Sequence, residues 1–174
     1  MFRLQAHLEE QLVAPITPVL GQSLVAIEYA VVSGELPEDW AADPSLCIGF
    51  GPVFHFSSGR SLAFLSIEGP LWHDRFTVSS SLEPLRTSDP LLCVPASHAV
   101  WGRDAIGQVF TAASVRGWAS SPHVVRLSFG SLSLVVTNGT SADLGETDDI
   151  LLATDPGAIL ITASETLWAS GPGA

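Results

Sequence analysis

The sequence predicts a mainly β protein, an antiparallel sandwich or a partly open barrel, made of two similar halves that each contain a β-hairpin. Short runs of β-branched and aromatic residues, broken by glycine and serine turns, indicate strands rather than helices. The same order of strand and hairpin occurs twice along the chain. After the N-terminus the chain lacks helical patterns long enough to connect parallel strands, which favours antiparallel sheets.

A short amphipathic helix is predicted at residues 2–13, where leucines lie one helical turn apart. Pro15 ends this pattern, because proline lacks the backbone N–H that a continuing helix requires. A second short helix is expected near Pro37, where two acidic residues follow the proline and suit the positive end of a helix dipole.

Three hairpins are predicted from apolar runs that flank glycine, serine or proline turns. They span residues 53–67, 124–136 and 150–162. Within the first hairpin, His55 alternates with Phe54 and Phe56, so its side chain is expected on the opposite face of the strand.

Each of the first two hairpins follows a strand that begins with an apolar residue, glycine and glutamine, at residues 20–26 and 106–112. This agreement predicts an internal duplication, with copies at residues 16–90 and 100–165. A chain of this length fits one domain, so the two copies are expected to share one core across residues 1–174.

The composition is unusually apolar, with 47% hydrophobic and 14% charged residues and a mean hydropathy of +0.36. Charged residues usually make up about 25% of a soluble domain. A surface with so few charges leaves apolar area exposed, which a second copy of the chain would cover. The sequence therefore predicts a homo-oligomer, most simply a homodimer.

The formal net charge is −11, and all 7 cationic residues are arginines spread singly along the chain. Nucleic acids and anionic membranes require clustered cations, so neither is expected as a partner. If there is a macromolecular partner, a basic protein fits this charge best; the alternative interpretation is that the negative charge only keeps an apolar protein soluble. The first residues include Arg3, Glu9 and Glu10 instead of the apolar run of a signal peptide, which predicts a cytoplasmic protein. In that compartment Cys47 and Cys93 are expected to be buried free thiols, with a disulfide between them as the alternative.

Motifs of covalent and phosphate chemistry are missing from the sequence. A phosphate-binding loop of the Walker type and a Schiff-base lysine both need lysine, and the chain has none. The nucleophile elbow G-x-S-x-G is also missing. These observations predict a protein that is not an enzyme and needs no cofactor. A dispersed Ser–His–acid triad stays open, because geometry rather than sequence defines it.

The histidines lack the close spacing of metal ligands, and the acidic residues 143–149 do not match a calcium-binding loop, so no metal site is predicted. An alternative hypothesis assembles a site from dispersed residues. The candidates for it are His55, His73, Asp74 and His123.

Tryptophan combines a large contact area with a polar N–H and is enriched at binding surfaces. We therefore take Trp40, Trp72 and Trp118, together with His73, as candidate binding residues. The alternative interpretation is that these tryptophans close the ends of a sandwich core.

Taken together, these patterns predict a non-catalytic binding or interaction module that acts as a homodimer. The alternative is a small jelly-roll or barrel enzyme, or a ligand carrier, that uses dispersed histidines and acids. In the order of its strands and turns the chain is loosely similar to β-rich bacterial domains, some of which are immunity proteins that neutralise toxins. This resemblance implies a protein partner and assigns no residue.

Overall fold

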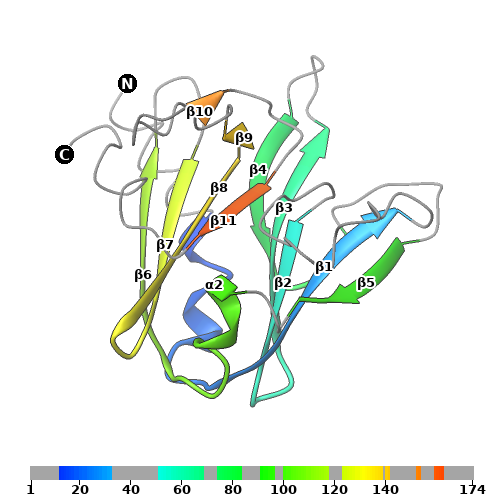
Figure 1. The fold of residues 1–174 in the computed structure, drawn as a ribbon. Helices are drawn as coiled ribbons and strands as arrows, with labels where there is room; N and C mark the ends of the chain where they lie inside the picture. The colour runs from blue at the N-terminus through cyan, green and yellow to red at the C-terminus, as the bar shows by residue number, and fades with distance from the viewer. Residues whose placement is uncertain are drawn as a thin grey trace.

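The computed structural model describes residues 12–32, 51–68, 74–83, 91–96, 100–117, 123–138, 140–141, 152–153 and 159–162. Within these ranges the protein is mainly β, which confirms the predicted fold class. Figure 1 shows two antiparallel sheets facing each other, both of them open rather than closed into a barrel.

The first sheet has five strands in the order β4-β3-β2-β1-β5. The three central strands form a meander, in which each strand pairs with the next one along the chain. The strands are β1 (Leu24–Val32), β2 (Gly51–Phe56), β3 (Ser61–Glu68), β4 (Asp74–Ser79) and β5 (Leu91–Pro95).

The second sheet has four strands in the order β11-β8-β7-β6 and contains a second meander. A separate pair consists of β9 (Thr140–Ser141) and β10 (Leu152–Ala153). The strands of the second sheet are β6 (Phe110–Gly117), β7 (His123–Phe129), β8 (Leu132–Asn138) and β11 (Ile159–Thr162).

The first two predicted hairpins are confirmed as β2–β3 and β7–β8. The third prediction, a hairpin at residues 150–162, is wrong. β10 pairs with β9, whereas β11 joins the edge of the second sheet beside β8. In this position Ile161 is fully buried in the core, a gain that a separate hairpin would not provide.

The strands that precede the two hairpins begin later than predicted. β1 begins at Leu24 and β6 at Phe110, each three residues after a glycine with positive φ. The φ angles are 78° at Gly21 and 84° at Gly107, a left-handed conformation that glycine adopts without the strain of a Cβ atom. An extended strand cannot continue through such a residue, so the predicted strands start too early.

The segments after these two glycines cross each other with reciprocal hydrogen bonds. The Gly21 N–H donates to the Phe110 carbonyl at 2.8 Å, and the Gly107 N–H donates to the Leu24 carbonyl at 2.7 Å. Leu24 and Phe110 in turn donate to the carbonyls of Gln108 and Gln22, and Ser23 forms a β-bridge with Val109. This crossing links the first strands of the two meanders.

Both meanders also contain an irregularity in the register at the same place. In the pairing of β1 with β2 it lies between Leu24 and Ala26, and in the pairing of β6 with β7 it lies between Phe110 and Ala112. A β-bulge leaves its extra residue outside the regular pairing. The residues between these positions, Val25 and Thr111, are both exposed.

The described helical structure is short. Of the helix predicted at residues 2–13, residues 2–11 lie outside the described ranges, and the chain then forms a 3-10 turn at Thr17–Val19. The predicted helix near Pro37 also lies outside them. α2 (Val100–Arg103) is a single turn that lies with the N-terminal segment between the two sheets in Figure 1.

The two sheets share one hydrophobic core. Phenylalanines form its centre: the Phe129 ring stacks on Phe110 with a centroid distance of 5.1 Å and on Phe54 with a distance of 6.4 Å. Phe56 packs against Phe110 at 5.7 Å. Since Phe54 and Phe56 lie in the first sheet and the other two rings in the second, these contacts join the sheets.

Candidate functional site

The residues predicted to bind a partner lie outside the described ranges. They are Trp40, Trp72, His73 and Trp118. The acidic segment at residues 143–149 lies outside them as well. Of the alternative set, Asp74 begins β4 and His123 begins β7, in different sheets, and His55 is the member whose side chain the structure describes.

His55 is the centre of a hydrogen-bonded group on the first sheet. Its Nδ1 atom lies 2.8 Å from the Ser61 hydroxyl oxygen, and its Nε2 atom lies 2.9 Å from the Glu28 carboxylate. The side chains of His55 and Glu28 are each 31% exposed. We call these three residues the His55 cluster.

The register of the central strands brings the His55 cluster together. His55 and Ser61 are directly opposite each other in the pairing of β2 with β3. Glu28 on β1 pairs with Val53, which places it diagonally from His55 on the same face. Phe54 and Phe56 are buried in the shared core, so His55 faces away from it, as the alternation in the sequence predicts.

The outer face around the His55 cluster is apolar and mostly buried. Ala30, Val53, Ala63 and Leu65 form a second hydrophobic cluster there, against which Leu82 and Leu91 pack. Hydrogen bonds are stronger in such surroundings than in water, because the local dielectric constant is lower. The three polar side chains therefore satisfy one another at the border of an apolar area.

The carboxylate determines which ring nitrogen of His55 carries the proton. An ionised carboxylate only accepts hydrogen bonds, so Nε2–H donates to Glu28. When the imidazole is neutral, Nδ1 is then the acceptor, and the Ser61 hydroxyl donates a hydrogen bond to it. A hydroxyl that donates to a basic nitrogen held by a third group is the arrangement of an activated nucleophile.

Cys93 lies next to the His55 cluster and differs from the sequence-based expectation. It is a free thiol but exposed, because β5 is at the edge of the first sheet. Partial desolvation by the surrounding protein raises the pKa of Cys93, and the nearby Glu28 carboxylate raises it further. A raised pKa keeps the thiol protonated and lowers its nucleophilicity. Cys47 lies outside the described residues.

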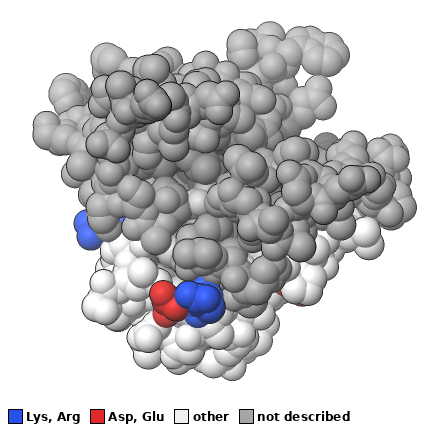
Figure 2. Space-filling view, in the orientation of Figure 1, with Lys and Arg blue, Asp and Glu red and all other residues white. Residues whose placement is uncertain are grey.

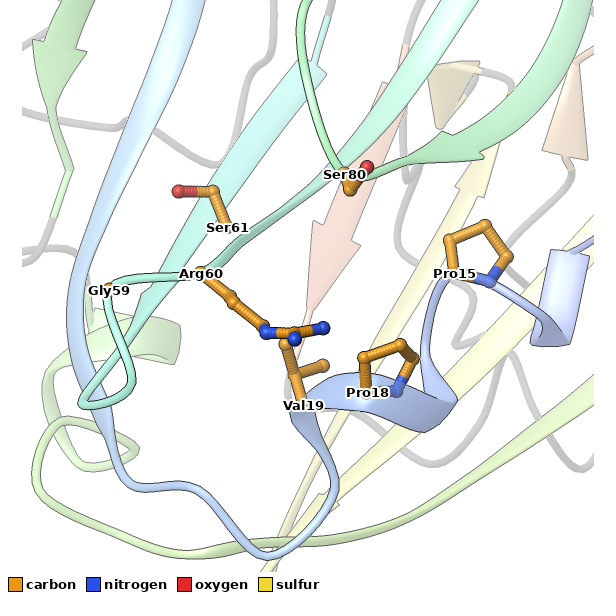
Figure 3. A pocket seen from close by; sticks show the side chains of 7 residues that line it. All are labelled: Pro15, Pro18, Val19, Gly59, Arg60, Ser61 and Ser80. Carbon is orange, nitrogen blue, oxygen red and sulfur yellow. The ribbon is translucent and has the colours of Figure 1, made fainter.

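An open pocket of about 410 Å³ lies on the other side of the β2–β3 turn. The N-terminal segment provides Pro15, Pro18 and Val19, and Arg60 projects into the pocket (Figure 3). Ser61 borders the pocket, but Figure 3 shows its hydroxyl directed away from the two prolines. The pocket and the His55 cluster are therefore separate features of the β2–β3 hairpin.

Comparison with known proteins does not extend this description. No protein-family model, curated protein or solved structure matches the chain. The function must therefore be inferred from the geometry of the chain itself.

Exposed apolar side chains gather where the two crossing segments meet. Val25 is 52% exposed, Val109 43% and Leu20 39%. They belong to residues 20–25 and 108–111, which contain no charged residue. We call these two segments the uncharged base. Figure 2 shows the lower part of the described surface as mostly white, with adjoining red and blue atoms within it and a further blue patch at its left border.

Two further observations apply to the described part of the chain. There, no group of three or more histidines, cysteines and acidic residues is placed to hold a metal ion. Within the same ranges, none of the helices has the length and hydropathy that crossing a membrane would need.

Sequence reasoning missed Ser61 and Glu28 as members of a site. A signal for Ser61 was present, since His55 and Ser61 lie on the two sides of the turn in the hairpin predicted at residues 53–67, and such positions face each other across a hairpin. Glu28 gave no comparable signal, because its distance from His55 depends on how β1 pairs with β2.

Proposed function

We propose that this protein is a binding module that acts as a homodimer and that the uncharged base is the dimer interface. The observation that carries the proposal is the exposure of Val25, Val109 and Leu20 on adjoining segments without charge. Exposed apolar groups on adjoining segments are typical of association surfaces. A free thiol at Cys93 fits a reducing, cytoplasmic environment.

The net charge explains why a second copy would bind through this surface. Two chains of formal charge −11 repel each other at most orientations. An uncharged surface allows contact without placing like charges opposite each other, which would cost several kcal/mol. Dimers with two-fold symmetry use the same patch on both subunits, so a patch compatible with itself is required.

We also propose that the two meanders are copies of one module, with residues 16–90 and 100–165 as the copies. Three correspondences support this duplication. The two copies share glycines with positive φ, reciprocal hydrogen bonds and register irregularities at equivalent positions. The separation along the chain between the copies is constant, because Gly107 lies as many residues after Gly21 as Phe110 lies after Leu24.

Replacement of Val25 by glutamate tests the dimer interface. We expect wild-type protein to sediment as a dimer and Val25→Glu to weaken the dimer by at least about tenfold, because the two-fold axis brings two new negative charges into one interface. The measurement is sedimentation velocity over a range of protein concentrations, with Val109→Glu as a second variant.

Leu92→Glu is the matched control, because Leu92 is 43% exposed but lies on β5, outside the uncharged base. We expect it to dimerise like the wild type. A wild-type protein that stays monomeric at high concentration would refute the proposal. If Leu92→Glu lost the dimer and the other two variants kept it, the interface would lie at the edge of the first sheet instead.

A further inference from the structure

We propose that Ser61 is a nucleophile, that His55 is its general base and that Glu28 is a positioning residue, which together react with uncharged carboxylic esters at the outer face of the first sheet. The two hydrogen bonds of 2.8 and 2.9 Å connect hydroxyl, imidazole and carboxylate in the order that such a triad requires. This inference goes beyond the binding function and does not depend on dimerisation.

The other hairpin shows that the fold does not require this combination of residues. At the corresponding place in β7 and β8, Ser128 pairs with Ser133. Ser133 accepts a hydrogen bond from Arg126 Nε at 3.3 Å. A guanidinium group remains protonated and cannot remove a proton from serine. His55 thus gives one of the two similar hairpins a base, and Glu28 on the neighbouring strand β1 holds that base.

The surroundings of the cluster indicate the class of substrate. His55 is partly exposed, so a small molecule can approach its ring from solvent. Val53 and Ala63 next to it are only 4% and 1% exposed, so they offer little contact surface to a long acyl chain. The negative charge of Glu28 disfavours anionic substrates. An ester with a short, uncharged acyl chain fits these three conditions.

The reaction follows from the direction of the hydrogen bonds. The Ser61 oxygen forms a bond to the carbonyl carbon of the ester while its proton passes to His55 Nδ1. The bond from carbon to the leaving alcohol oxygen then breaks, and the alcohol takes that proton. A water molecule attacks the resulting acyl-serine and gives a proton to His55, which returns it to Ser61 as the carboxylic acid leaves. The sum is ester plus water to acid plus alcohol.

A fluorophosphonate probe, which labels activated serines covalently, tests the nucleophile directly in the full chain. We expect one adduct by intact-protein mass spectrometry and its location on Ser61 by peptide mapping. Ser61→Ala should abolish the adduct, whereas the matched control Ser133→Ala should label at the wild-type rate. Absence of labelling in the wild type, or equal labelling of Ser61→Ala, would overturn the proposal.

The roles of the other two residues are tested by labelling rates as a function of pH. His55→Gln should slow labelling by about 10²-fold or more, because a general base is lost. In Glu28→Gln the amide can donate to Nε2, which favours the tautomer with a proton on Nδ1 and slows labelling at every pH. Rates unchanged in both variants would refute the triad.

A structural role alone would predict a different result. If the His55 cluster served only to hold the strands together, its variants would lower the unfolding midpoint without any labelled serine in the wild type. Unfolding midpoints of all variants, followed by circular dichroism, are therefore measured alongside. Ser61→Ala removes a single hydroxyl at a partly exposed position, so we expect this variant to fold. A loss of labelling in it would then report the missing nucleophile and not unfolding.

Discussion

The two ring nitrogens of His55 face residues from two different strands. Ser61 lies across the hairpin on β3, and Glu28 is on β1, 27 positions away in the sequence. Alternation along β2 predicts the face on which His55 lies, but it does not predict the atoms that this face brings within 3 Å. At the residue scale the chemistry therefore depends on cross-strand neighbours rather than on a motif.

Cys93 provides a test of electrostatics beside the His55 cluster. Its pKa is raised first by desolvation and second by Glu28, so its thiolate fraction near neutral pH is below that of a free cysteine. We expect slow alkylation by iodoacetamide that accelerates as the pH rises. In Glu28→Gln the reaction should be faster, because the carboxylate no longer opposes the thiolate, but still slower than for a free cysteine, since desolvation remains.

The alkylation measurement needs a background in which Cys93 is the only cysteine, obtained by Cys47→Ser. Glu83→Gln is the control, because Glu83 is an exposed acid that does not contribute to the raised pKa. Its alkylation rate should equal that of the background protein. An identical rate in Glu28→Gln would show that Glu28 has no influence on the thiol.

At the scale of elements, the strands were predicted well where their signals are local. The hairpins β2–β3 and β7–β8 follow from alternating apolar residues and glycine turns. The predicted starts of β1 and β6 lie before the observed ones in the chain, because the sequence does not show that Gly21 and Gly107 adopt positive φ. The pairing of β11 was also missed, since the edge that a strand joins is a non-local choice.

Gly21 and Gly107, whose N–H groups link the two crossing segments, give a prediction at this scale. A Cβ atom at Gly107 would meet nothing within 4 Å, so the cost of Gly107→Ala comes from the left-handed backbone alone. We expect about 1–2 kcal/mol lower free energy of unfolding. Gly107→Asn should lose less, because asparagine tolerates this conformation better. Urea denaturation measures both.

Gly21 extends the glycine test to the proposed duplication. It has φ 78° and also has no atom within 4 Å of an added Cβ, so Gly21→Ala should cost about as much as Gly107→Ala. Clearly different costs would mean that the two crossings are not equivalent. Full stability in both alanine variants would contradict the positive φ angles.

At the scale of the whole molecule, the core phenylalanines determine how the two sheets behave together. The Phe129 ring contacts Phe54 in the first sheet and Phe110 in its own sheet, and all three side chains are fully buried. A core shared in this way couples the unfolding of the two sheets. We therefore expect a single cooperative transition rather than separate unfolding of two halves.

Phe129→Ala tests this coupling. Loss of a buried phenylalanine ring should lower the free energy of unfolding by about 3–5 kcal/mol. Far-ultraviolet circular dichroism and tryptophan fluorescence should report the same midpoint before and after the change. Val25→Ala is the control, expected to change stability by no more than about 0.5 kcal/mol because Val25 is exposed. Two separate transitions would show that the halves unfold independently.

The sequence by itself determined the mainly β class, the central hairpins and the face on which His55 lies. These properties follow from the two-residue period of a strand and from turn residues, both of which act over a few positions. Tertiary structure alone decided that Glu28 and Ser61 meet His55, that Cys93 is exposed on an edge strand and that β11 pairs with β8. Register and edge position depend on which apolar surfaces can be buried together, and that is a property of the whole chain.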